Sequence, residues 1–370
     1  MKTYKLGEVC ELSKGKTITR ATTREGEVPV IGGGLGPTYF HDEDNRKPPV
    51  ITISASGANA GFVNYWDVPI WASDCTTITE KPGSPALIGY IYRYLQSRQN
   101  FINSELRRGS AQPHVYPSDI SSLEIQLPSL EKQYEIVNRL DNAFAEIDLL
   151  EENLEQSDQN SKQLLQAILS GSFENSGVKQ EFGGILSDER QTWPSVALKD
   201  FCKMYQPSTI STKEMIPTGK YVVYGANGPI GRYNKFNHEE PQLLVTCRGA
   251  TCGAVNMSEP FAWINGNAMV IQPNLDVATL DYMKYAFLGG IDISSSITGS
   301  AQPQITRTTL EVLKVPLPTL DRQIEIVEKL DFVFTEIEVL RSRLKLKKDL
   351  VGALRKSLLS GAFNQNKEVA

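Results

Sequence analysis

The sequence predicts an α+β fold that consists of two tandem β-rich α/β modules and two long helices. Three observations support this prediction. The second half of the chain repeats the first. Within each half, short apolar runs between Gly, Pro and Asn turns are typical of strands. Each half then changes to a seven-residue apolar repeat, which predicts a long helix that pairs as a coiled coil.

The internal duplication is clearest where each module leads into its helix. Gly109–Pro113 recurs as Gly299–Pro303, and the halves then align without a gap, with roughly a third of the positions identical. The upstream parts align more weakly, for example through Cys10 with Cys202. The duplication predicts a first module at 1–128, a helix at 129–173, a linker at 174–192, a second module at 193–318, a helix at 319–363 and a tail at 364–370.

Each predicted helix begins at a good N-cap residue that follows a proline, Ser129 or Thr319. We expect the helices to end at Gly171 and Gly361, because glycine is common just past a helix end. Both helices carry one apolar seam with a heptad period. The seam residues are Leu140, Phe144, Ile147 and Leu154 in the first helix and Leu330, Phe334, Ile337, Leu344, Val351 and Leu358 in the second.

The middles of the two helices carry opposite charge. Glu151 and Asp158 of the first helix correspond to Arg341 and Lys348 of the second. An antiparallel pair brings the two middles together, so we predict that the helices pair with each other inside this chain. The alternative is two faces that are solvated independently of each other.

The composition is that of an ordinary intracellular globular protein. The chain has 370 residues, is 40% hydrophobic and 22% charged, and has a formal net charge of −5. No apolar run approaches the roughly 18 residues that a membrane span needs. Its five cysteines are scattered, which fits a reducing compartment and does not favour structural zinc. We therefore expect a cytoplasmic protein without a metal site.

No catalytic constellation stands out in the sequence. The glycines of Gly32–Gly36 lack the spacing of a dinucleotide-binding loop, and no GxxxxGK[ST] motif is present. The three histidines, His41, His114 and His238, are isolated from one another. These absences predict a protein that binds rather than catalyses.

Two motifs stand out along the chain, and the second of them occurs in both halves. Leu6–Val9 opens the first module, and Leu127–Gln133, followed by Ile136 and Val137, opens its helix. Leu317–Gln323 repeats the second motif. With these motifs the chain resembles the DNA specificity (S) subunit of type I restriction–modification systems along essentially its whole length. The second module departs from the family pattern at its start, where Leu198-Lys199-Asp200-Phe201 replaces Leu-Gly-Glu-Val and Gln206-Pro207-Ser208 replaces Lys14-Gly15-Lys16.

The resemblance implies a non-catalytic subunit. Each module would be a target-recognition domain that reads one half of a bipartite site in double-stranded DNA. The paired helices would set the half-site spacing and dock two adenine methyltransferase subunits and, through them, the restriction (translocase) subunits. S-adenosylmethionine, ATP and Mg are then expected on those partners and not on this chain. Because the modules differ at Lys14/Gln206 and Ser56/Arg248, we expect an asymmetric target.

Candidate DNA contacts are the basic side chains in the loops of the two modules, because Lys and Arg supply most phosphate contacts and Arg also reads guanine. They are Lys14, Lys16, Arg20, Arg24, Arg107 and Arg108 in the first module and Lys213, Lys220, Arg232, Lys235, Arg248 and Arg307 in the second. The repeated Gly109–Pro113 segment is expected to be a hinge between module and helix, with a backbone contact to phosphate as the alternative.

Two other functions remain open. The chain is also compatible with an orphan specificity chain that serves another multisubunit restriction system. From a different class, it is compatible with a coiled-coil scaffold whose β-rich modules bind protein or carbohydrate. Failure to bind DNA together with a methyltransferase partner would favour the scaffold.

Overall fold

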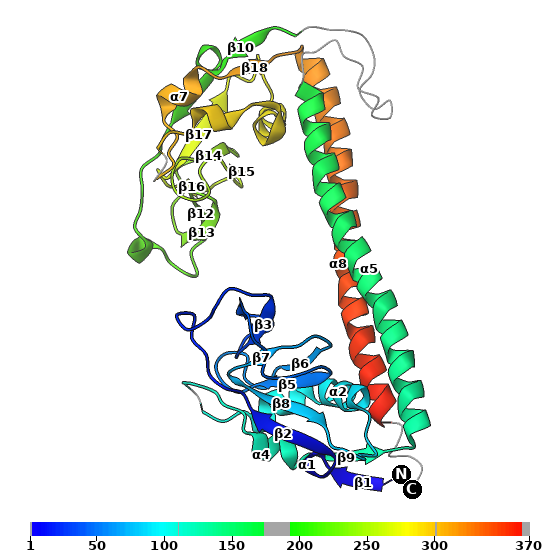
Figure 1. Ribbon diagram of the computed structural model, residues 1–370. Coiled ribbons are helices and arrows are strands. Elements are labelled where there is room, and N and C mark those ends of the chain that lie inside the picture. The colour runs from blue at the N-terminus through cyan, green and yellow to red at the C-terminus, as the bar shows by residue number, and fades with distance from the viewer. Residues whose placement is uncertain (1, 110, 174–192, 300–301, 365–370) are drawn as a thin grey trace. The chain divides into compact units, whose positions relative to one another are not determined.

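The structure is a computed structural model that describes residues 2–109, 111–173, 193–299 and 302–364 (Figure 1). The chain divides into two compact units, residues 1–154 with 346–370 and residues 155–345. Each unit therefore contains one β-rich module and a part of both long helices. This division cuts across the linear boundaries expected from sequence, because each long helix contributes to the packing of both units.

The first module contains two sheets, in which most neighbouring strands are antiparallel, and a separate antiparallel strand pair. The four-stranded sheet has the order β2 (Cys10–Lys14), β8 (Cys75–Glu80), β5 (Val50–Ser54) and β6 (Val63–Trp66). The three-stranded sheet has the order β4 (Tyr39–His41), β3 (Val28–Ile31) and β7 (Trp71–Ala72), with β3 and β7 parallel. Strand β1 (Lys2–Lys5) pairs with β9 (Glu124–Leu127). The helices are α1 (Leu6–Val9), α2 (Ile88–Ser97), α3 (Gln99–Phe101) and α4 (Pro117–Ser121), with a π-helical turn at Ile102–Leu106.

The second module repeats this topology. Its four-stranded sheet has the order β11 (Cys202–Tyr205), β17 (Ala268–Pro273), β14 (Leu243–Thr246) and β15 (Val255–Met257). Its three-stranded sheet has the order β13 (Gly228–Tyr233), β12 (Tyr221–Gly225) and β16 (Trp263–Ile264), and β12 and β16 are parallel. Strand β10 (Ser195–Ala197) pairs with β18 (Lys314–Pro316). The helices are α6 (Leu280–Tyr285) and α7 (Arg307–Glu311), with a π-helical turn at Ala286–Gly290 and 3-10 turns at Leu198–Asp200, Thr212–Glu214 and Ile293–Ser296.

The core of each module lies between its four-stranded sheet and a helix. Central strands β5 and β14 are buried at every position, as their uninterrupted apolar and threonine runs predict. In the first unit, α2 lies between this sheet and the long helices (Figure 1). Its apolar residues share one cluster with Ile136, Val137 and Phe363 of the long helices. The module core therefore continues into the helical part of its unit.

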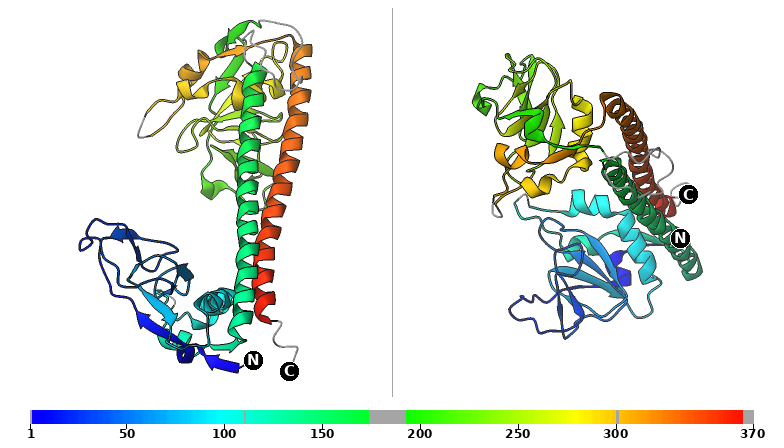
Figure 2. Two further views of the ribbon diagram at one scale, coloured as in Figure 1. Left: turned by 45° about the vertical axis from the view of Figure 1, so that its right-hand side comes forward. Right: turned by 90° about the horizontal axis from the view of Figure 1, so that it is seen from above.

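The two long helices pair antiparallel, which confirms the predicted coiled coil. They are α5 (Leu130–Phe173) and α8 (Leu320–Asn364), and they run side by side in both views of Figure 2. In the first unit, Arg355 donates to Asp148 and lies 3.3 Å from Glu151. In the second unit, Arg341 lies 3.4 Å from Asp158. Basic side chains of α8 therefore meet acidic ones of α5 on both sides of the middle. None of the described helices combines the length and apolar character that a membrane crossing requires.

All ten predicted seam residues are buried or half-buried. Leu140, Phe144 and Ile147 form a cluster in the first unit to which Val351 and Leu358 contribute. In the second unit, Leu330 and Phe334 belong to the cluster that also contains the core of the second module. The seam thus serves helix pairing and module attachment together.

The prediction that Gly171 and Gly361 end the helices is wrong. Helix α5 continues through Gly171 to Phe173, and α8 continues through Gly361 to Asn364. Phe173 is buried against Tyr282 of the second module, with ring centroids 5.2 Å apart. Tertiary packing of the last turn therefore overrides the local preference of glycine for a helix end.

The predicted hinge at Gly109–Pro113 is also wrong. Arg108 and His114 exchange two backbone hydrogen bonds of 2.9 and 2.8 Å, so this segment closes a hairpin. Helix α4 and strand β9 follow it before α5 begins. Thr298 and Gln304 close the corresponding hairpin in the second module in the same way. The connection between module and helix is made elsewhere, at the first turn of α5 and α8.

Candidate nucleic-acid interface

The loop that follows β2 in the first module begins at Gly15 and is held by backbone hydrogen bonds to the end of β7 and the start of β8. The backbone N–H groups of Gly15 and Lys16 donate to Cys75 and Ala72 at 2.9 and 2.8 Å. A Cβ atom on Gly15 would lie 2.0 Å from the carbonyl oxygen of Ser73, so this close approach requires glycine. The candidates Lys14 and Lys16 flank it with exposed side chains. The Lys16 ammonium lies 5.8 Å from the centre of the Trp71 ring, so one of the two candidates stands beside an aromatic side chain.

Other candidates of the first module are engaged within the protein. Arg24 forms ion pairs with Asp42 at 2.7 Å and Glu43 at 2.5 Å. The hydrogen bond from Arg24 holds the pKa of the Asp42 carboxyl below its ordinary value. These two carboxylates compensate the charge of the Arg24 guanidinium. Arg20 lies in an exposed turn nearby.

Arg107 and Arg108 contact the loops that surround them. Arg107 donates to the carbonyl oxygen of Ala58 at 2.8 Å. Arg108 pairs with Asp119 at 2.8 Å and lies 5.6 Å from the centre of the Tyr116 ring. Both side chains thus stabilise the loops at the end of β5 and before α4, and their contact with DNA stays a prediction.

Of the candidates in the second module, Arg232 and Lys220 lie together. The Arg232 guanidinium donates to the carbonyl oxygens of Gly219 and Lys220 at 2.6 and 2.8 Å, and Lys220 lies 5.1 Å from the centre of the Tyr221 ring. Lys213 and Lys235 are also exposed, and they lie apart from each other in the sequence.

Arg248 and Arg307 line one hollow of about 390 Å³ in the second module. Its lining residues are Met204, Tyr205, Gln206, Arg248, Met269, Gln304, Ile305, Thr306 and Arg307. Arg307 also pairs with Glu311 at 2.5 Å. The hollow therefore brings together two of the predicted arginines with Gln304, a residue that the charge-based prediction missed.

A buried glutamine connects each module to its long helix. Gln133 is fully buried; its side-chain oxygen accepts from Leu87 N–H at 2.8 Å, and its amide group donates to the carbonyl oxygens of Pro85 and Pro128 at 2.8 and 3.0 Å. Gln323 makes the same contacts in the second unit, with Thr279, Val277 and Pro318. The sequence contained a signal for this role, because both glutamines occupy the same place in the motif that opens each long helix.

Further along each long helix, a second contact with the module is also repeated. It is an ion pair in the first unit and a hydrogen bond in the second. Asp141 of α5 pairs with Arg93 of α2 at 2.5 Å. The corresponding Asp331 of α8 accepts a hydrogen bond from Tyr285 of α6. Burial, and after it this hydrogen bond, raises the pKa of the Tyr285 hydroxyl. Each module is therefore held to its helix by these two polar contacts in addition to the shared apolar clusters.

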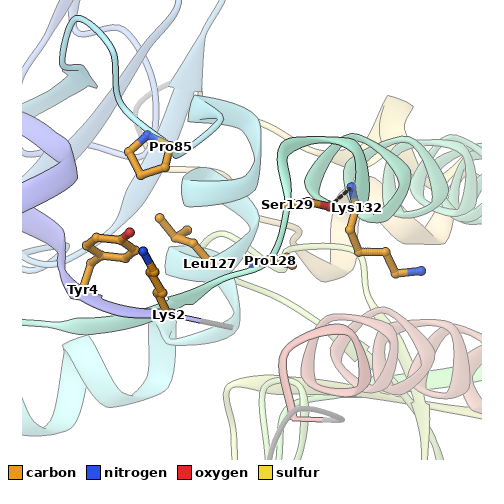
Figure 3. Close-up of a pocket in the computed structure, with 7 residues that line it drawn as sticks. All are labelled: Lys2, Tyr4, Pro85, Leu127, Pro128, Ser129 and Lys132. Atoms are coloured by element: carbon orange, nitrogen blue, oxygen red, sulfur yellow. Dashed lines mark hydrogen bonds between the residues drawn. The ribbon is translucent and has the colours of Figure 1, made fainter.

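The hollow in Figure 3 lies at the first of these junctions, at the start of α5. It measures about 640 Å³ and is lined by Lys2, Tyr4, Pro85, Leu127, Pro128, Ser129 and Lys132. The Lys132 N–H donates to Ser129 Oγ at 3.4 Å, which is the N-cap contact predicted for this helix. The Lys132 ammonium pairs with Glu135 at 2.8 Å. This hollow belongs to the surface of the junction between the first module and α5.

The described cysteines have the properties of structural thiols. Burial raises the pKa of Cys10, Cys75 and Cys202 to about 12, so these thiols are neutral and poor nucleophiles near neutral pH. Among the residues that the structure describes, no group of three or more His, Cys, Asp or Glu side chains is placed to hold a metal ion.

Comparison with known proteins identifies the family. The family described as "Type I restriction modification DNA specificity domain" matches residues 1–157 and 190–347. The type I restriction enzyme EcoDI specificity subunit of Escherichia coli is 23% identical over 398 residues, which cover 98% of this chain and 87% of that protein. The MjaVIII specificity subunit of Methanocaldococcus jannaschii is 23% identical over 319 residues, covering 79% of this chain and 73% of that protein.

Two solved structures share the fold. A chain from work on complex assembly and conformational transition of the type I restriction–modification system has a TM-score of 0.73 at 17% identity, and the match covers 98% of this chain and 97% of that one. The HsdS subunit from Thermoanaerobacter tengcongensis has a TM-score of 0.55 at 17% identity, covering 98% and 96%. Since the family's domain matches twice, once over each module and most of its helix, the chain belongs to the type I restriction–modification DNA specificity family.

Proposed function

We propose that this chain is the non-catalytic subunit that directs a type I complex to a bipartite, asymmetric DNA site. The observation that carries the proposal is a common framework with different surfaces. Both modules have the same topology and the same glutamine junction. Matching surface positions nevertheless carry different side chains, such as Ser56 and Arg248. Two similar frameworks that present different side chains are suited to read two different half-sites.

The partners in this proposal are two adenine methyltransferase subunits and, through them, restriction subunits. An apolar stripe on α8 supports docking of this kind. Phe332, Val339 and Leu346 recur every seven residues and are 68%, 40% and 60% exposed. Each follows a seam residue by two positions, which turns it about 200° away from the seam. The stripe therefore faces away from α5, where an amphipathic helix of a partner can cover it.

The chemistry in this proposal belongs to the partner subunits. S-adenosylmethionine, ATP and Mg would bind to the methyltransferase and restriction subunits. The role of this chain is to bind DNA, select the sequence and position the partners on it. Its own residues take no part in methyl transfer or in cleavage.

The first prediction concerns the methylation pattern. Co-expression of this chain with its methyltransferase subunit should methylate adenines in one bipartite, asymmetric motif, mapped across a genome by single-molecule sequencing. Deleting the gene for this chain should abolish the motif, and returning the gene should restore it. An intact complex that methylates no bipartite motif would contradict the proposal and favour a scaffold.

The second prediction concerns the spacing of the half-sites. Duplicating one heptad in each helix, residues 148–154 of α5 and 339–345 of α8, preserves the seam and lengthens the pair by about 10.5 Å. The gap between half-sites should grow by about three base pairs, since ten base pairs span about 34 Å.

Both half-sites should keep their sequence in this variant. The same duplication in α5 alone shifts the seam residues of the two helices relative to one another, and it serves as the control that should lose activity. A mapped motif whose gap is unchanged would show that the helices do not set the spacing.

A further inference from the structure

A hairpin with the same backbone contacts occurs in both modules. It is closed by Arg108 and His114 in the first module and by Thr298 and Gln304 in the second. The hairpin is joined to the loop after the central strand through isolated bridges, which pair Ser56 with His114 and Arg248 with Gln304. Flanking backbone bonds are also repeated, from Gly57 to Pro113 at 3.0 Å and from Gly249 to Pro303 at 3.2 Å.

On this common backbone, the bridge partners differ between the modules while their neighbours do not. Glycine follows both Ser56 and Arg248, and proline precedes both His114 and Gln304. Bridge partners are adjacent across the ladder, and their side chains lie on the same face. Each module therefore carries one variable pair of side chains at a constant place.

The surroundings of the two pairs differ in charge. Ser56 donates a hydrogen bond to Asp74 Oδ2, which adds a carboxylate acceptor to the first pair. Asn267 occupies the corresponding place in the second module, since its carbonyl oxygen accepts from Cys247 N–H as that of Asp74 accepts from Ala55 N–H, and its amide replaces that carboxylate. The second pair thus consists of a guanidinium and an amide without this acidic neighbour.

The second pair lies at the rim of the 390 Å³ hollow described above. Arg248 and Gln304 are exposed, while Met204, Met269 and Ile305 beneath them are buried. Within the described ranges, neither the Arg248 guanidinium nor the Gln304 amide forms a hydrogen bond or ion pair with another residue. Their donors and acceptors are free to meet a ligand, unlike those of Arg107, Arg108 and Arg232.

We propose, on the basis of the proposed function, that Arg248 and Gln304 determine the base sequence that the second module reads. The ligand is the purine edge of double-stranded DNA. Arginine donates two hydrogen bonds to O6 and N7 of guanine, and glutamine pairs with N6 and N7 of adenine. Ser56 and His114 occupy the corresponding reading position in the first module.

The test compares Arg248→Ser and Arg248→Lys in the complete complex with the methyltransferase subunits. Lysine keeps the positive charge and loses the planar fork that matches guanine. Both variants should relax one base position of one half-site, by about 5- to 150-fold in preference, measured as methylation rates on a library of substrate duplexes. The other half-site should stay unchanged. Arg343→Lys, an exposed arginine on α8, is the matched control.

A mirrored variant assigns the half-sites. Ser56→Arg with His114→Gln places the second pair on the first module and should alter only the half-site that Arg248→Ser leaves unchanged. If Arg248→Lys keeps the wild-type preference, or if Arg248→Ser lowers methylation equally on all sequences, Arg248 contacts phosphate and the inference is overturned. If the wild-type complex itself selects no bipartite motif, the proposed function fails and the inference fails with it.

Discussion

Replacing Gln133 by leucine is expected to detach the first module from α5. Leucine has a similar size, but it cannot accept from the N–H of Leu87 or donate to the carbonyl oxygens of Pro85 and Pro128. The loss of stability should be about 1–3 kcal/mol, the usual cost when a buried polar group loses its partner. Hydrogen exchange of the Leu87 amide should rise steeply, because its hydrogen bond of 2.8 Å is lost.

Two variants control this experiment. Gln156→Leu removes an exposed glutamine from the same helix, where the side chain bonds only locally to Asn160, and should leave the Leu87 amide protected. Gln323→Leu should expose the Thr279 amide in the second unit and leave Leu87 unchanged. Wild-type protection of Leu87 in Gln133→Leu would show that the glutamine does not hold this junction.

Replacing Phe173 by alanine is expected to destabilise the second unit by about 3–5 kcal/mol, the usual cost of removing a buried aromatic ring. Only 3% of Phe173 is exposed, and its ring packs on Tyr282. A Cβ atom on Gly290 would lie 2.2 Å from Cγ of Phe173, so the ring fills the space that the glycine leaves. Urea unfolding followed by hydrogen exchange in 280–290 measures the effect.

Phe332→Ala is the matched control for this change. Phe332 is 68% exposed on α8, so its removal should leave the stability of the free chain almost unchanged. Phe363, the counterpart of Phe173, is half-buried against Tyr90 and Tyr94, and its replacement should have a smaller effect confined to the first unit. Equal stability of Phe173→Ala and Phe332→Ala would contradict the packing described here.

The sequence predicts well those features that depend on local periodicity. The heptad spacing of Leu330, Ile337 and Leu344 indicates a long helix, and the opposite charges in the two helices indicate their antiparallel pairing. These patterns need no knowledge of distant contacts. The ends of the helices depend on such contacts, and there the prediction fails. Phe173 is buried by the second module, which follows it in the chain, so Gly171 does not end the helix.

The candidate site is predicted less well, because charge alone does not show how a side chain is engaged. Arg24 and Arg108 look equivalent to Arg248 in the sequence. In the structure the first two pair with carboxylates, while Arg248 borders a hollow. Gln133 was visible only as a motif residue, since nothing local shows that a glutamine on a helix will accept a hydrogen bond from Leu87, 46 residues earlier in the chain.

The first unit combines segments that are synthesised at very different times. Leu140, Phe144 and Ile147 are covered by side chains from 351–363, more than two hundred residues later in translation. Until that segment leaves the ribosome, a nascent chain carries an uncovered apolar row along α5. Such surfaces are bound by chaperones and attacked by proteases. A product that stops before Val351 keeps this row exposed, so cellular quality control can distinguish it from the longer chain.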